Sequence, residues 1–120
     1  MSATLNFREL GDVTIIDVAG KIKLGEGAVS LRDAVRDLVA RNQKRILLNL
    51  AAVNYIDSSG IGELVAAFTT LTNQGGQLKL LNLTKRVQDL LQITKLYTVF
   101  EVYDNEAHAI RSFSSLAATA

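Results

Sequence analysis

An apolar run followed directly by a polar, glycine-containing stretch is the strongest constraint in this sequence. Residues 46–50 are almost entirely apolar, as in a strand that is buried on both faces. Residues 54–63 follow, and from Ile61 onward apolar side chains recur at the spacing of one helical face. The sequence therefore predicts a strand that leads into a helix, with polar residues at the junction.

The junction carries three residues that favour helix starts, Asp57, Ser58 and Ser59. Their oxygens can accept hydrogen bonds from the unpaired amides of a first helical turn. Those amides and the helix dipole also favour negative charge, so a serine here can carry a phosphate without unfolding the domain. Gly60 and Gly62 each cost about 1 kcal/mol of helix propensity. This cost favours a docking surface, which a partner's backbone can approach closely, over a simple polar helix cap, and both interpretations stay open.

The order of these elements and the junction motif resemble the STAS domain, in particular the bacterial anti-sigma factor antagonists. The motif consists of Asp57, Ser58, Ser59, Gly60, Ile61 and Gly62. The resemblance runs from about Leu5 to the last helix. It implies that Ser58, the serine directly after the aspartate, is the phosphoacceptor.

The resemblance also implies that a glycine-rich basic loop lies beside the phosphorylation site and joins the partner-binding surface. We expect Ile22 and Leu24 to be exposed apolar residues of that loop. Many family members carry acidic residues where this chain has Lys21 and Lys23, which leaves the identity of the partner open. An ordinary connection between strand and helix is the alternative. The expected partner-binding residues are Asp57, Ser58, Ser59, Gly60, Ile61, Gly62, Lys21, Ile22, Lys23 and Leu24.

The remaining pattern predicts one α/β domain over residues 1–120, with an ordered core at about 4–114. Strands are expected at 4–9, 13–18, 77–82 and 99–103, with Gly20 breaking the second. A first helix is expected around residues 28–38, a short helix capped by Thr84, and a last helix opened by Asp104. Right-handed crossovers then give a mixed, mostly parallel sheet of four or five strands. About four helices should pack mainly on one face of this sheet.

Charge and composition exclude several classes of function. Thirteen basic and twelve acidic residues leave a net charge of +1, so no strong field draws the protein to nucleic acid. The chain lacks cysteine, and we expect no disulfide and no thiolate metal site. Residues 1–6 show neither the basic segment nor the apolar core of a signal peptide, and no apolar run is long enough to span a bilayer. We therefore expect a cytoplasmic protein without membrane insertion, direct nucleic-acid contact or cofactor.

A serine hydrolase is the enzyme alternative for a serine on a strand-to-helix turn. Its nucleophile motif would need a glycine where this chain has Ile56. It would also need a histidine base, and His108 lies about fifty residues downstream. The sequence therefore predicts no catalytic activity.

The resemblance implies a reversible switch. Unmodified Ser58 would permit docking on a serine-kinase anti-sigma factor, which then releases its sigma factor. The kinase would phosphorylate Ser58 and end the complex, and a phosphatase would restore the serine. Asp57 would accept the proton of the Ser58 hydroxyl or orient that group. The alternative is a constitutive STAS scaffold subunit of a signalling assembly or transporter, and the sequence leaves open whether the free protein forms a weak homodimer.

Overall fold

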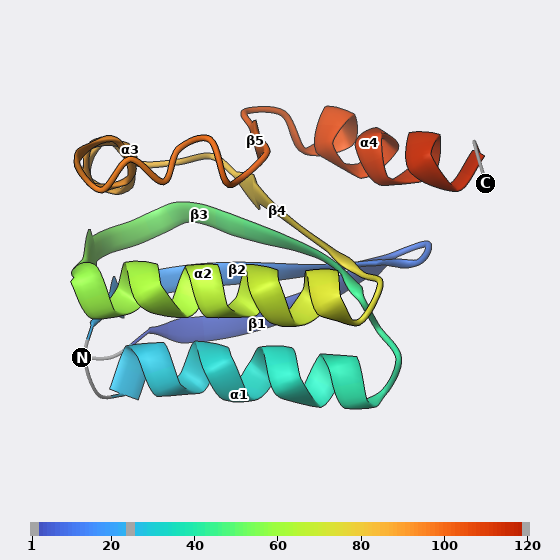
Figure 1. Ribbon diagram of the computed structural model, residues 1–120, viewed down its shortest axis with the longest axis horizontal. Coiled ribbons are helices and arrows are strands. Elements are labelled where there is room, and N and C mark those ends of the chain that lie inside the picture. Colours follow the sequence, from blue (N-terminus) through green and yellow to red (C-terminus); the bar gives the residue numbers. More distant parts are fainter. Residues whose placement is uncertain (1–2, 24–25, 119–120) are drawn as a thin grey trace.

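A five-stranded sheet organises the chain, with helices on both of its faces (Figure 1). The computed structural model describes residues 3–23 and 26–118, and the side chains of these residues except 26–29 and 114–118. The strands are β1 (Thr4–Leu10), β2 (Val13–Ile22), β3 (Arg45–Ile56), β4 (Gln77–Leu81) and β5 (Val102–Tyr103). The helices are α1 (Glu26–Ala40), α2 (Ser58–Asn73), α3 (Lys85–Ile93) and α4 (Glu106–Ala118).

The sheet has the order β1-β2-β3-β4-β5. β1 pairs antiparallel with β2 through a tight turn that contains Gly11 at φ 62°, and the other pairs are parallel. Each parallel pair is joined by a helix, as crossover connections require. The predicted mixed, mostly parallel sheet is confirmed.

Alternation along the central strands builds two cores. Ile16, Leu48 and Leu80 lie in the larger core, with buried side chains of α1, α2 and α3. Their sequence neighbours Ile15, Leu47 and Leu81 lie in the smaller core, under Ala109 and Phe113 of α4. Successive side chains of a strand point to opposite faces, so three helices cover one face and α4 covers the other. The expectation that the helices pack mainly on one face is confirmed.

Two strands extend further than the sequence predicted. β2 continues past Gly20 to Ile22, and β3 continues past Leu50 to Ile56. The pairing of these strands shifts twice, between Asp17 and Ala19 and between Gly20 and Lys21. Such bulges let a strand continue through residues that break the regular alternation. Gly20 therefore bends the strand, at φ 98°, and does not end it.

The C-terminal elements differ in their bounds. The last strand covers Val102–Tyr103, because only those residues pair with β4 at Leu80 and Leu81. Asn105 rather than Asp104 opens α4, since its side-chain oxygen accepts a hydrogen bond from the His108 amide at 2.9 Å. α4 reaches Ala118, past the expected ordered core. Thr84 caps α3 as predicted. Among the described residues, no helix has both the length and the apolar composition needed to cross a bilayer.

Candidate functional site

The junction between β3 and α2 has the predicted geometry. β3 ends at Ile56, and Asp57 is the N-cap of α2 with an extended backbone (φ −115°, ψ −175°). Its Oδ1 accepts a hydrogen bond from the Gly60 amide at 2.9 Å, and its carbonyl accepts one from the Ile61 amide at 3.0 Å. The capping role that the sequence predicted for Asp57 is confirmed.

Ser58 occupies the first position of α2 and is exposed. Ser59 is half-buried. An exposed serine at a helix N-terminus can be reached by a second protein, and the positive end of the helix dipole favours an added negative charge there. The phosphorylation of Ser58 stays a prediction.

The two glycines of the first turn have different roles. Gly60 is buried, and a Cβ atom there would lie 2.7 Å from Cγ1 of Ile56 and would meet the carbonyl oxygen of Ile22. Its small size therefore serves the contact between α2 and β2 inside the domain. Gly62 is exposed, with open space around the position of a Cβ atom. Gly62 alone of the two fits the expected close approach of a partner.

Ile61 and Ile22 are parts of the core. Ile61 is 3% exposed and Ile22 is fully buried. The expectation that Ile22 is an exposed loop residue is wrong, because β2 continues to Ile22 and turns this side chain towards the helices. Partner contact through these two side chains requires exposure that the fold does not provide. Ile22 and Ile61 therefore lie beneath the predicted docking surface, where they pack in the core and do not form part of the surface itself.

The segment after Gly20 does lie beside Ser58. The amide of Asp57 donates a hydrogen bond to the carbonyl of Ile22 at 3.3 Å, and Lys21 pairs in register with Tyr55. Lys21 and Lys23 are exposed at this end of the sheet. Leu24 lies outside the described residues. The structure thus brings together Lys21, Lys23, Asp57, Ser58, Ser59 and Gly62 as surface residues.

A contact that sequence reasoning missed extends this region. The guanidinium of Arg86, at the start of α3, lies 4.4 Å from the centre of the Tyr55 ring. This distance is that of a cation–π contact. No local pattern in the sequence indicates this contact, because Tyr55 and Arg86 lie on elements that are far apart in the chain.

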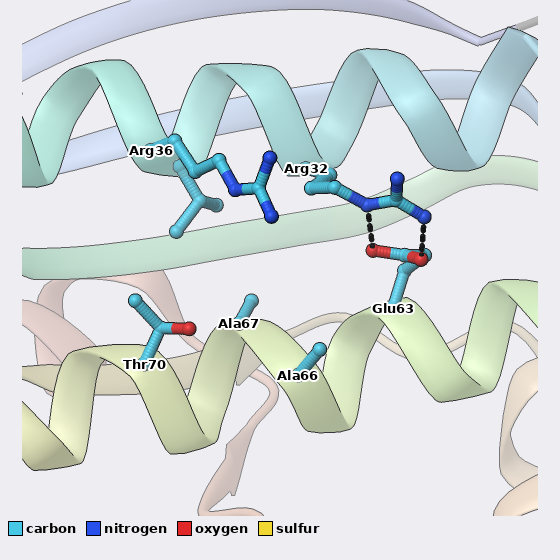
Figure 2. Close-up of a pocket in the computed structure, with 7 residues that line it drawn as sticks. Arg32, Arg36, Glu63, Ala66, Ala67 and Thr70 are labelled. Atoms are coloured by element: carbon cyan, nitrogen blue, oxygen red, sulfur yellow. Dashed lines mark hydrogen bonds and ion pairs between the residues drawn. The ribbon is translucent and has the colours of Figure 1, made fainter.

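A charged pair ties α1 to α2 next to the junction. Figure 2 shows the guanidinium of Arg32 facing the carboxylate of Glu63, with two hydrogen bonds between them. Arg32 holds the pKa of Glu63 below its ordinary value, mainly through these hydrogen bonds and against the effect of burial. The pair borders a pocket of about 110 Å³ between the helices, also lined by Val35, Arg36, Ala66, Ala67 and Thr70. Since Glu63 compensates Arg32, the pair braces the helices that present Ser58.

The arrangement required for a serine hydrolase is missing. His108 is exposed on α4, where its ring contacts that of Tyr103 at 5.3 Å between centroids. α4 packs on the sheet face opposite to α2, so His108 cannot act on Ser58. The described residues also contain no group of three histidine, cysteine or acidic side chains that could hold a metal ion.

Comparisons with known proteins match most of the chain. The model of the STAS domain matches residues 4–109. The anti-sigma-B factor antagonist of Bacillus subtilis is 34% identical over 87 residues, which cover 72% of this chain and 78% of that protein.

Solved structures share the fold. A proposed anti-sigma factor antagonist from Thermotoga maritima superposes with a TM-score of 0.83 at 24% identity, over 90% of this chain and 92% of that one. The Bacillus cell fate determinant SpoIIAA in its phosphorylated form gives a TM-score of 0.73 at 18% identity, over 92% and 99% of the chains.

Proposed function

Because this chain belongs to the STAS domain family, we propose that it is an anti-sigma factor antagonist that works as a phosphorylation switch. Unphosphorylated, it docks in the cytoplasm on a serine-kinase anti-sigma factor, which releases its sigma factor. The kinase then phosphorylates Ser58 and ends the complex, and a phosphatase reverses the modification. The chain acts by binding and performs no catalysis itself.

One observation carries the proposal: an exposed serine occupies the first position of α2, directly after the capping Asp57. The name of the Bacillus subtilis relative supports the role of an antagonist. SpoIIAA has been solved in a phosphorylated form, so this fold accommodates a phosphate.

The docking surface is proposed to consist of Ser58 and its exposed or half-exposed neighbours. These are Asp57, Ser59, Gly62, Lys21 and Lys23. Asp57 already accepts the Gly60 amide through Oδ1. We assign it the further task of orienting the Ser58 hydroxyl towards the nucleotide of the kinase.

The deciding experiment incubates the purified protein with ATP and, in turn, each purified serine-kinase anti-sigma factor of its source organism. We expect one phosphate, located on Ser58 by phosphopeptide mass spectrometry. Ser58→Ala should remove the label and Ser59→Ala should keep it. A label on Ser59 or on a threonine contradicts the residue assignment.

The switch is tested by binding. Unphosphorylated wild type should bind the kinase and displace its sigma factor in a competition assay, whereas Ser58→Asp should do neither. If Ser58→Asp displaces the sigma factor with the same efficiency as the wild type, the result would favour a constitutive scaffold over a switch.

A further inference from the structure

Part of one sheet face is left uncovered by α4. The apolar residues beneath α4 are Val13, Ile15, Leu47 and Leu81, close to the starts of β2 and β3 and to the end of β4. β2 and β3 continue beyond them to Ile22 and Ile56. The carboxyl ends of these two strands therefore present a face to solvent beside the start of α2 (Figure 1).

Lys21 and Tyr55 lie together on this uncovered face. They are register partners in adjacent parallel strands, so their side chains share one face of the sheet. The next pair, Ile22 and Ile56, is fully buried in the core beneath the helices α1, α2 and α3. Alternation then places Lys21 and Tyr55 on the opposite face, directly before the Asp57 cap.

Arg86 completes a row of three side chains. Its guanidinium carbon lies 4.4 Å from the centre of the Tyr55 ring, and α3, which contacts β3, lies beside the end of that strand (Figure 1). A guanidinium in a cation–π contact is positioned by the ring without its N–H donors being used in hydrogen bonds, so these donors can form a two-bond fork with a carboxylate. The ring thus orients Arg86 and leaves its donors available.

Within the part of the chain whose side chains the structure describes, the charge of this row is uncompensated. Among the described side chains, neither Lys21 nor Arg86 has a carboxylate partner. The carboxylate of Asp17, further along β2, is bound by Arg8 at 2.7 Å and by the Asn49 amide at 2.8 Å. Exposed Lys23 adds a further positive charge at the same end of the sheet.

We propose that Lys21, Tyr55 and Arg86 form a basic docking surface that binds an acidic segment of the serine-kinase anti-sigma factor. This proposal rests on the proposed function and names the chemistry of the partner. The surface is continuous with the Ser58 junction, so one partner covers both. Carboxylates fit this row because it offers the two-donor guanidinium of Arg86 and the ammonium group of Lys21. Affinity for nucleic acid, in contrast, needs several phosphate contacts and a strongly basic protein.

The test measures the affinity of the purified, unphosphorylated protein for the purified kinase at low and high salt. Lys21→Glu and Arg86→Glu should each weaken binding about tenfold at low salt, and the double variant about a hundredfold, with a smaller effect at high salt. Arg111→Glu is the matched control, because Arg111 is an exposed cation on α4. It should change the affinity less than about twofold.

The ring has its own pair of variants. Tyr55→Phe keeps the stacking surface and should keep the affinity. Tyr55→Leu removes the ring and should weaken binding about as much as Arg86→Glu, because Arg86 loses its orientation. Unchanged melting curves show that the variants are folded. For Lys21→Glu and Arg86→Glu the KM of Ser58 phosphorylation should rise while kcat stays constant, since the surface docks the kinase and does not touch the serine.

The outcomes separate the two proposals. A wild type that binds and is phosphorylated, with an affinity that the double variant leaves unchanged, overturns the basic surface and leaves the switch intact. A wild type that binds no serine-kinase anti-sigma factor overturns both. Charge-sensitive binding of a single-stranded DNA oligonucleotide, without charge sensitivity towards the kinase, overturns the assignment to an acidic protein segment.

Discussion

Two glycines in the first turn of α2 face different surroundings, and the same substitution should affect them in opposite directions. Gly60→Ala places a Cβ atom against the Ile22 carbonyl and Cγ1 of Ile56. The resulting overpacking should lower the free energy of unfolding by about 1–3 kcal/mol. Gly62→Ala meets open space and should raise it by up to about 1 kcal/mol, because alanine favours a helix.

Urea denaturation of the two variants beside wild type checks this prediction. Equal midpoints for both variants would mean that β2 and α2 are not in the close contact described. The result for Gly60 also matters for function. A loss of partner binding in a Gly60 variant would report a displaced α2 and not a blocked docking surface.

Ser58→Asp should fold as well as the wild type. The side chain is exposed at the start of α2, where an added negative charge contributes about 0.3–1 kcal/mol of stability at low salt. Thermal unfolding measures it, with Ser30→Asp in the second turn of α1 as the control for a charge beyond the first helical turn. A melting temperature lowered by many degrees would show that Ser58 is buried.

At the scale of the elements, the brace between α1 and α2 should make stability depend on pH. Arg32 lowers the pKa of Glu63 in the folded protein below its ordinary value of 4.5. The unfolded chain then binds the proton more readily, so the stabilisation is fully present above about pH 4.5 and is lost as the pH falls through the lowered pKa. Glu63→Gln removes this contribution.

Denaturation midpoints between pH 7 and pH 3 test the brace. The wild type should lose more stability over this range than Glu63→Gln, and the difference should develop below about pH 4.5. Glu9→Gln is a suitable control, since Glu9 is an exposed residue of β1. Parallel curves for wild type and Glu63→Gln would show that Glu63 and Arg32 do not interact in solution.

Elements with a strong local signal could be predicted from the sequence. The Asp57 cap and the Thr84 cap depend on neighbouring residues, and both lie where expected. The lengths of β2 and β3 depend on bulges, which are properties of the pair and leave no periodic pattern in either strand. The sequence therefore ended both strands too early and placed Ile22 in a loop.

Contacts between distant elements had no signal in the sequence. The stack of Arg86 on Tyr55 requires α3 to lie beside the end of β3, which only the packing of the whole sheet determines. The pairing of Arg32 with Glu63 likewise needs the relative placement of α1 and α2. Local sequence indicated the position of Ser58 but not the surface around it.

At the scale of the whole molecule, phosphorylation should act locally. One face of the central strands is packed by α1, α2 and α3, and part of the other face by α4, so a rearrangement would disrupt two cores. A phosphoserine adds close to two negative charges that the helix start can accept. A partner would have to desolvate that charge. A cost of about 2.7 kcal/mol already weakens binding a hundredfold.

Amide NMR before and after phosphorylation of Ser58 measures how far the change extends. We expect shifts confined to residues 57–64 and 21–27. Shifts spread over β3, β4 and α4 would contradict a local mechanism. The Ser58→Ala protein, treated with the same kinase and ATP, controls for effects of the reagents.

The hydrogen bond from Asp57 to Ile22, and the carbonyl of Ile22 above Gly60, mean that the residues around Ser58 come from two distant parts of the chain. A short peptide containing Ser58 would lack β2, and its Asp57 would not be held in place as a helix cap. It would therefore lack the geometry that a kinase would recognise. Such a kinase would recognise a conformational epitope and not a linear motif. The phosphate would then also report the folding state of its carrier, because only a native molecule could receive it. Copies that are newly made or damaged, and therefore not folded, would stay unphosphorylated. They would also be unable to bind the kinase and occupy it.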